Sequence, residues 1–188
     1  QNDTANRSSP IQIPGTQWSN ENGQFYHSRA TLAIKTDGTL WGWGNHTSGT
    51  LGLNDEVKRS SPTQIPGTEW KLVTTAAQTF AIKTDGTLWA FGSGSSGSIP
   101  INSGDVNYSS PKQIPGTQWK TASAGNYFHC ATKTDGTFWM WGGSGGNGRL
   151  GLNNEVSVNY SSPIQVPGTQ WGYGNVSEGS TFFLKNYS

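Results

Sequence analysis

The stretch Phe80-Ala-Ile-Lys-Thr-Asp-Gly-Thr-Leu-Trp-Ala-Phe-Gly92 decides the fold of this 188-residue chain. Two runs of apolar and β-favouring residues flank Asp85-Gly86, and such a pair is the strongest short-range signal for a β-hairpin. Because Asp and Gly tolerate a positive φ, the pair predicts a type I′ turn. The stretch recurs as Leu32–Gly44 and as Cys130–Gly142. Three copies of one hairpin indicate a repeat protein.

A second motif recurs between the hairpins. Ser-Ser-Pro triplets begin at Ser8, Ser60, Ser109 and Ser161, spaced by 52, 49 and 52 residues. Each is followed by Gln-Ile/Val-Pro-Gly-Thr-x-Trp, ending at Trp18, Trp70, Trp119 and Trp171. A unit of about fifty residues is in the range of propeller blades. We therefore predict one propeller domain over 1–188, divided into an outer strand (1–17), three blades (18–67, 68–116 and 117–168) and a partial blade (169–188).

Each unit is expected to form four strands. The first follows the Trp and consists of small residues, as in Thr74–Ala77, which suits the crowded centre of a ring. The hairpin supplies the second and third strands. The fourth contains Ser-Pro-x-Gln-Ile-Pro-Gly, and proline belongs on an edge strand because it cannot donate to a ladder. This radial order is that of a β-propeller blade, so the predicted fold class is all-β.

The third strand carries alternating aromatic and small residues. Trp41 and Trp43 are expected on one face and Gly42 and Gly44 on the other. The rings would then stack into the gap of the neighbouring blade. This arrangement predicts a core role for the aromatics rather than a base-stacking or sugar-binding role.

The composition excludes several partners. The net charge is +1 and only 12% of residues are charged, so the chain lacks the basic surface that nucleic acid or an anionic membrane requires. No run reaches transmembrane length, and no signal-peptide pattern occurs. We therefore predict no nucleic-acid partner and no membrane insertion.

Residues with reactive side chains show no catalytic pattern. Cys130 is the only cysteine and replaces Leu32 or Phe80 of the other copies, so it is expected to be a buried filler. His27, His46 and His129 lack metal-ligand spacing and are expected to be structural. The acidic groups at 54–56 and 153–155 lack the ligand density of a calcium loop and are expected to be solvated.

Two segments, 92–97 and 143–148, match the dinucleotide-binding pattern G-x-G-x-x-G. That pattern binds a pyrophosphate only when a helix follows, and no helical periodicity follows either copy. We interpret both as blade loops. No nucleophile with its base and no paired acid and base is recognisable, so we predict no enzyme, no catalytic residue, no cofactor and no metal.

The pattern Ser-Pro-x-Gln-Ile … Trp … Ala-x-Lys-Thr-Asp-Gly-Thr-Leu-Trp-x-Trp-Gly … Leu-Gly-Leu-Asn resembles the repeats of the regulator of chromosome condensation family. The resemblance covers nearly the whole chain and implies a propeller of four-stranded antiparallel blades, usually seven. The residue pattern of the repeats is similar to that of bacterial and phage-encoded members.

The chain holds about three and a half repeats, which leaves three arrangements open. It is part of a larger ring, or a small closed ring in which Ser8–Pro14 and Trp171–Lys185 share a blade, or one of two chains that complete a ring together. Because both ends fall within a repeat, we expect a piece of a longer chain.

The loops between the third and fourth strands differ most between copies: Asn45–Arg59, Ser93–Tyr108 and Gly143–Tyr160. Variable loops on a rigid frame are expected to carry recognition. We predict a non-enzymatic structural or binding module on an extracellular or virion surface, such as a fibre, adhesin or decoration domain. Its partner would be a glycan or a protein, contacted by His46, Asn147 and Arg149.

Two other functions stay open. The resemblance implies a guanine-nucleotide exchange factor for a small GTPase, although no loop here matches a motif that would support exchange. A multivalent lectin with repeated pockets between its blades is the third possibility.

Overall fold

The computed structural model describes residues 9–10, 12–19, 30–45, 47–102, 104–143, 148–153, 157–176 and 181–185. In this part the chain is all-β, apart from the single-turn 3₁₀ helix η1 (Ser95–Gly97). The strands are β1 (Ala30–Ile34), β2 (Leu40–Gly44), β3 (Arg59–Gln64), β4 (Trp70–Thr75), β5 (Gln78–Lys83), β6 (Leu88–Gly92), β7 (Tyr108–Gln113), β8 (Trp119–Ala124), β9 (Phe128–Lys133), β10 (Phe138–Gly143), β11 (Asn159–Val166), β12 (Trp171–Val176) and β13 (Thr181–Lys185).

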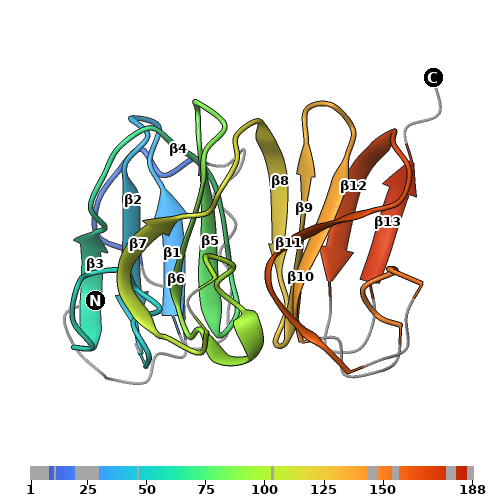
Figure 1. Cartoon of the computed structure of the whole chain (residues 1–188). Coiled ribbons are helices and arrows are strands. Elements are labelled where there is room, and N and C mark those ends of the chain that lie inside the picture. The colour runs from blue at the N-terminus through green and yellow to red at the C-terminus, as the bar shows by residue number, and fades with distance from the viewer. Residues whose placement is uncertain are drawn as a thin grey trace.

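The strands form antiparallel sheets in chain order (Figure 1). β4-β5-β6-β7 and β8-β9-β10-β11 are complete four-stranded blades. β1-β2-β3 is extended by a bridge between Trp18 and Lys35, and β12-β13 is a half-blade. Proline-containing β3, β7 and β11 lie at sheet edges. The all-β fold with four-stranded blades, predicted from the repeats, is confirmed.

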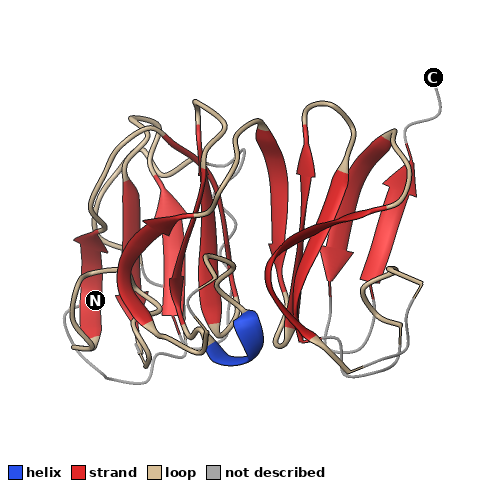
Figure 2. Ribbon diagram, viewed as in Figure 1, coloured by secondary structure: helices blue, strands red, loops and turns tan. Residues whose placement is uncertain are grey.

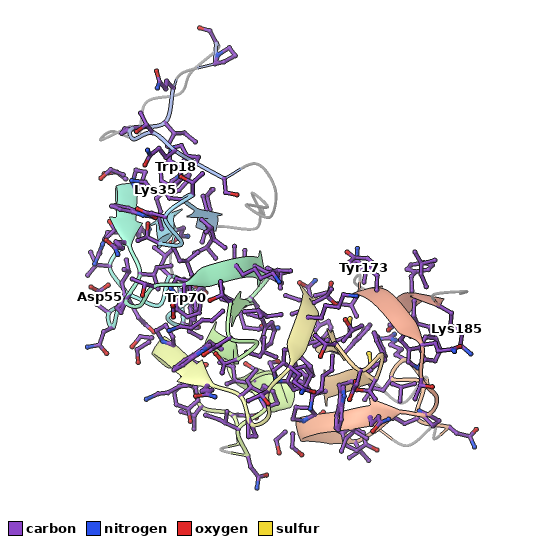
Figure 3. All side chains as sticks on the ribbon, turned by 90° about the horizontal axis from the view of Figure 1, so that it is seen from above. Trp18, Lys35, Asp55, Trp70, Tyr173 and Lys185 are labelled. Carbon is purple, nitrogen blue, oxygen red and sulfur yellow. The ribbon has the colours of Figure 1, made fainter. Side chains whose placement is uncertain are left out.

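The sheets stand side by side in an open arc. Seen from above, Trp18 lies at one end, and Tyr173 and Lys185 lie at the other (Figure 3). The chain is thus a partial propeller and does not form the small closed ring by itself. The blade boundaries predicted from the repeats, including an outer strand within 1–17, stay predictions.

The first strand of each blade lies innermost, as its small residues predicted. β4 contacts β8, and β8 contacts β12. The main-chain N of Ala124 lies 3.3 Å from Thr74 Oγ1, and Ser123 Oγ donates to Asn175 Oδ1 over 2.8 Å. Short polar side chains therefore let the inner strands approach each other and bond across the junctions.

The Asp-Gly hairpin differs from the prediction in its turn type. Gly86 N donates to Lys83 O, and Lys83 N donates to Thr87 O, both over 3.0 Å. In the turn Gly86 has a φ of 77°, whereas Asp85 is not among the positive-φ residues. This is a type I turn followed by a left-handed glycine, so the predicted type I′ turn is wrong. The carboxylate of Asp85 holds this form by accepting from Thr87 N, 2.9 Å away.

The same turn also joins adjacent blades, by a main-chain bond that recurs at each junction. Trp119 N, at the start of β8, donates to Gly86 O over 2.9 Å. The equivalent bonds are Trp70 N to Gly38 O at 2.9 Å and Trp171 N to Gly136 O at 3.0 Å. The two recurring sequence motifs therefore meet at every junction between blades.

The core lies between the blades. Phe91 and Trp141, the second aromatics of their strands, are fully buried, which confirms a core role for them. The predicted stacking into a glycine gap is wrong: Gly42 is packed by Leu32, Leu51 and Ile65 of its own blade. The Phe91 ring instead lies against Gly52, where an added Cβ would come within 2.8 Å of it.

Candidate functional site

The blades present two different ends (Figures 1 and 2). The Asp-Gly end, at the top of both views, carries the hairpin turns. The loop end, at the bottom, carries η1, the connections between first and second strands, and the variable loops between third and fourth strands. The described parts of the loops in which recognition was predicted therefore lie at the loop end, opposite the recurring turns.

At the Asp-Gly end, a lysine lies between two tryptophans. Lys83 Nζ is 4.9 Å from the ring centre of Trp70 and 5.2 Å from that of Trp89. Trp89 Nε1 donates to Thr87 Oγ1 over 2.9 Å, and Thr87 Oγ1 donates to Asp85 Oδ1 over 2.7 Å. These contacts explain why Lys, Asp, Thr and Trp occur together in the motif.

The same arrangement recurs in the other two hairpins, with Lys35 over Trp18 and Trp41, and Lys133 over Trp119 and Trp139. A cavity of about 250 Å³ beside the middle cluster is lined by Pro66, Gly67, Trp70, Lys83, Trp89, Ser110 and Pro111. In the described part, the buried Nε1 of Trp18, Trp70, Trp119 and Trp171 has no hydrogen-bond partner. This end is mainly frame, and the recess beside the middle cluster is the candidate site that it offers among the described residues.

The loop end contains two adjoining cavities, of about 350 and 320 Å³. They share Ala77, Ser93 and Asn126, and together we call them the polar groove. Its other lining residues are Ala30, Asn45, Thr47, Ser48, Thr50, Ala76, Gln78, Ser95, Ser96, Ser98 and Tyr127. The groove thus runs across three blades.

Most of the lining side chains carry a hydroxyl or an amide group, and none of the lining residues is charged. Tyr127 adds an aromatic ring that is 59% exposed. Ser93 Oγ and Ser95 Oγ lie 2.8 Å apart, so two hydroxyls lie close together where the chain enters η1. Such a lining can donate and accept hydrogen bonds with an uncharged polar ligand and stack one apolar face of it.

Part of two of the three variable loops belongs to the frame. Asn54 N donates to Ser109 O of the next blade over 2.6 Å, and Asn102 N donates to Ser161 O over 3.0 Å. Both asparagines have a positive φ, 62° and 60°. The Leu-Gly-Leu-Asn segment at 51–54 and the Ile-Pro-Ile-Asn segment at 99–102 therefore join blades, which the sequence did not predict.

Of the three residues predicted to contact a ligand, only Arg149 lies among the described residues. His46 and Asn147 lie outside the described residues, although Asn45 and Thr47, the chain neighbours of His46, line the groove. Arg149 is half-buried, and its main-chain oxygen accepts from Thr181 Oγ1 over 3.0 Å. It is not among the lining residues, and its role stays a prediction.

Sequence reasoning missed Ser93, Asn126 and Tyr127. Asn126 and Tyr127 lie in a short connection between the first and second strands, which is not one of the long variable loops. Of these three residues, only Tyr127, an aromatic residue in a turn, had a sequence feature that could have indicated a binding site. The spacing of these residues along the chain does not indicate that residues from three blades meet in one groove.

Two buried titratable groups are structural, as predicted. His129 is fully buried, and burial lowers the pKa of its imidazole from 6.5 to about 3. Its ring lies 5.0 Å from that of Phe80, and its Nε2 lies 2.8 Å from Gln78 Nε2. Burial raises the pKa of the Cys130 thiol.

The remaining motifs carry no site in the described part. Asp55 forms an ion pair with Arg59 at 2.6 Å, so this carboxylate supports its own loop. No three His, Cys, Asp or Glu side chains among the described residues are grouped to hold a metal ion. The segment 92–97 leads only into η1. Within the same residues, no helix is long and apolar enough to cross a membrane.

Comparison with known proteins supports the repeat assignment. The regulator of chromosome condensation (RCC1) repeat matches residues 37–78, which run from the first Asp-Gly turn to the start of β5. No curated protein matches the sequence. Among solved structures, human WBSCR16 has a TM-score of 0.74 at 19% identity, over 84% of this chain and 43% of its own.

Prp20p from Saccharomyces cerevisiae has a TM-score of 0.70 at 15% identity, over 86% of this chain and 43% of its own. Yeast RCC1 (Prp20) bound by Kap60 has a TM-score of 0.72 at 14% identity, over 84% of this chain and 40% of its own. The chain thus spans about two fifths of each of these structures. Residues 37–78 thus match one regulator of chromosome condensation (RCC1) repeat, and the chain folds as a partial β-propeller.

Proposed function

We propose that the chain is a non-enzymatic binding module that holds an uncharged glycan in the polar groove. The single observation that carries this function is the groove itself. It joins hydroxyl and amide side chains of three blades into one lining without charged groups, beside the exposed ring of Tyr127. A concave polar site with one aromatic wall suits a sugar, which offers hydroxyls at its rim and C–H groups on its faces.

The frame supports this function by holding the groove rigid. Main-chain bonds join adjacent blades at both ends, through glycine turns at one end and asparagine loops at the other. A preorganised site loses little conformational entropy when a ligand binds. The proposed setting is the one predicted from the sequence, an extracellular or virion surface, where glycans of a host cell are accessible.

The proposal is tested by glycan-array screening of the 188-residue chain, followed by calorimetry with the best ligand. Asn126→Ala and Tyr127→Ala are each expected to weaken binding about tenfold, since each removes one bonding or stacking contact. The melting temperature should stay unchanged. Gln165→Ala, at an exposed position on β11 outside the groove, is the matched control. Glycan binding that survives both groove substitutions would contradict the proposal.

A multivalent lectin is the second candidate, favoured by the recurring Lys–Trp clusters with their unpartnered Trp Nε1 groups. Stoichiometry separates the two sites. The polar groove is one site per chain, whereas the clusters would give several equivalent sites. Trp89→Ala would weaken binding at a cluster and leave binding in the groove intact.

A regulatory function through a protein partner is the third candidate. Prp20p, which shares the fold, is described by its binding properties to Gsp1p and histones. Purified chain added to a small GTPase loaded with a fluorescent nucleotide gives the test. Faster nucleotide release would support exchange activity, and unchanged release would exclude it for that GTPase.

A further inference from the structure

A buried carboxamide lines the second cavity of the polar groove, the one of about 320 Å³. Gln78, the first residue of β5, is only 1% exposed, yet it belongs to the lining of this cavity. Counted back from the lysine of the Asp-Gly motif, the equivalent positions in the first and third blades hold Ala30 and Phe128. Both are apolar and buried. The blade frame therefore does not require a polar side chain at this position.

The amide nitrogen of Gln78 is used inside the protein, whereas its oxygen is not. Nε2 donates to Gly125 O of the next blade over 3.0 Å and lies 2.8 Å from His129 Nε2. Because Gly125 O can only accept, the atom that contacts it is the amide nitrogen. In the described part of the chain, Oε1 accepts no hydrogen bond. Since Gln78 lines the cavity, Oε1 is the acceptor that this side chain offers to a ligand there.

A pair of hydroxyls in the same cavity offers a hydrogen-bond donor. Ser93 Oγ and Ser95 Oγ share one hydrogen bond, in which either can be the donor. Such a bond uses one of the two hydroxyl hydrogens and leaves the other to be donated. No other oxygen among the described residues accepts that second hydrogen. Ser95 is exposed and Ser93 half-buried, so a ligand in the cavity can reach the pair.

An aromatic ring completes the lining of this cavity. Tyr127 is 59% exposed and lines the second cavity but not the first. The cavity thus combines a buried acceptor, a hydroxyl donor and an apolar surface, and none of its lining residues is charged. An acetamido group is uncharged and carries the three complementary features: an N–H donor, a carbonyl acceptor and a methyl group. A plain sugar hydroxyl lacks the methyl group and cannot contact all three features at once.

We propose that the second cavity binds the acetamido group of an N-acetylhexosamine residue in a glycan. Its N–H would donate to Gln78 Oε1, and its carbonyl oxygen would accept from the pair formed by Ser93 and Ser95. Its methyl group would contact the ring of Tyr127. Gln78 then determines specificity, because a ligand without the N–H leaves a buried acceptor unpaired. The inference rests on the glycan-binding function proposed above and adds the class of sugar that the groove selects.

The test varies the ligand and uses the unaltered 188-residue chain in NMR titrations. The probes are N-acetylglucosamine and N-acetylgalactosamine, each with its parent hexose and with an analogue in which a methylene group replaces the acetamido N–H. For at least one of the two series, the parent hexose should bind at least about tenfold more weakly, since it lacks the carbonyl and methyl groups. The methylene analogue should also be about tenfold weaker, because it leaves Gln78 Oε1 unpaired. Saturation-transfer spectra should show their largest signal at the acetyl methyl protons, and Tyr127→Ala should reduce that signal.

Two variants connect the result to Gln78. Gln78→Met keeps the length of the side chain but removes the acceptor, so it should bind the acetamido sugar and its methylene analogue equally. Thr47→Ala, which lines only the first cavity, should change both affinities by the same factor. If circular dichroism shows that Gln78→Met does not fold, the ligand series decides alone. Equal affinity of the unaltered chain for both acetamido sugars and their parent hexoses would overturn the inference and leave glycan binding in the groove intact. A chain that binds no glycan on the array and none of these sugars would overturn both proposals.

Discussion

The Asp-Gly end and the loop end of the propeller both hold adjacent blades together, but they use different residues. Both join adjacent blades by a main-chain hydrogen bond. At the Asp-Gly end the bond is Trp N to Gly O, formed at three junctions within 0.1 Å of one length, from 2.9 to 3.0 Å. At the loop end it is Asn N to Ser O, formed at two junctions over 2.6 and 3.0 Å.

The difference lies in what surrounds these bonds. At the Asp-Gly end, the lysine, threonine and tryptophan contacts repeat from blade to blade. At the loop end, each blade has its own neighbours: an ion pair in the first and η1 in the middle one. Identical contacts indicate a frame, and the polar groove opens where the contacts differ. We therefore expect the stability of the fold to depend on the Asp-Gly end more than on the tips of the loops.

The largest effect is expected from acid, at a buried group near the loop end. His129 is neutral when folded, because burial lowers its pKa to about 3 from 6.5. The unfolded chain binds a proton below pH 6.5, so the stabilisation is complete above that pH and is lost as the pH falls toward 3. At pH 5 the free energy of unfolding should be lower by about 2 kcal/mol.

Urea denaturation at pH 7 and pH 5 measures this loss. His129→Gln should lower the free energy of unfolding at both pH values. The difference between the values at pH 7 and pH 5 that is due to this residue should disappear. A slope that is unchanged in His129→Gln would place the acid sensitivity elsewhere.

The second prediction compares two left-handed glycines. Gly86 has a φ of 77°, and a Cβ there would lie 3.2 Å from the backbone of Gln118 in the next blade. Gly104, in a variable loop, has a φ of 68° with nothing within 4 Å. Gly86→Ala should lower the free energy of unfolding by about 2 kcal/mol and Gly104→Ala by about 1 kcal/mol, since only the first adds a clash to the backbone cost. Equal losses in urea denaturation would mean that the turn is not needed to join the blades.

The third prediction concerns the lysine between the tryptophans. Lys83→Met keeps most of the apolar stem and removes the ammonium, which lies over two rings. The loss should be about 1 kcal/mol, measured by thermal and urea denaturation. Lys185→Met is the matched control, because among the described residues Lys185 lies over a single ring, that of Trp171. It should lose about half as much, and a larger loss there would argue against the two-ring account.

Features of the fold that depend on interactions between residues near each other in the sequence were predictable, and the others were not. The hairpins, the inner strands of small residues and the outer strands with proline follow from local turn chemistry and period-two patterning. The turn type was not predictable from Asp85-Gly86 alone. It depends on the carboxylate of Asp85 bonding Thr87 rather than on the tolerance of Asp for a positive φ.

The candidate site was less predictable than the fold. The loop end was expected to carry recognition, and the polar groove does open there. Its shared residues Ser93 and Asn126 nevertheless come from different blades, and only the curvature of the arc brings them together. No spacing in the sequence encodes that curvature, so the predicted contacts His46, Asn147 and Arg149 were chosen from loop position alone.

The smallest effect expected is also the most specific to one end. Thr87→Val keeps the shape of the side chain but removes the hydroxyl that accepts from Trp89 and donates to Asp85. The loss should be about 0.5–1 kcal/mol by urea denaturation. The pKa of Asp85, held below its usual value chiefly by the Thr87 hydroxyl, should rise in a carboxyl NMR titration. Ser95→Ala at the loop end removes an exposed hydroxyl that bonds Ser93, and should change stability by less than about 0.5 kcal/mol. The contrary outcome is an equal loss of unfolding free energy for the two substitutions and an unchanged pKa of Asp85. The hydrogen bonds that link Asp85, Thr87 and Trp89 would then contribute no more than an ordinary surface contact, and the two ends would not differ in the way their geometry indicates.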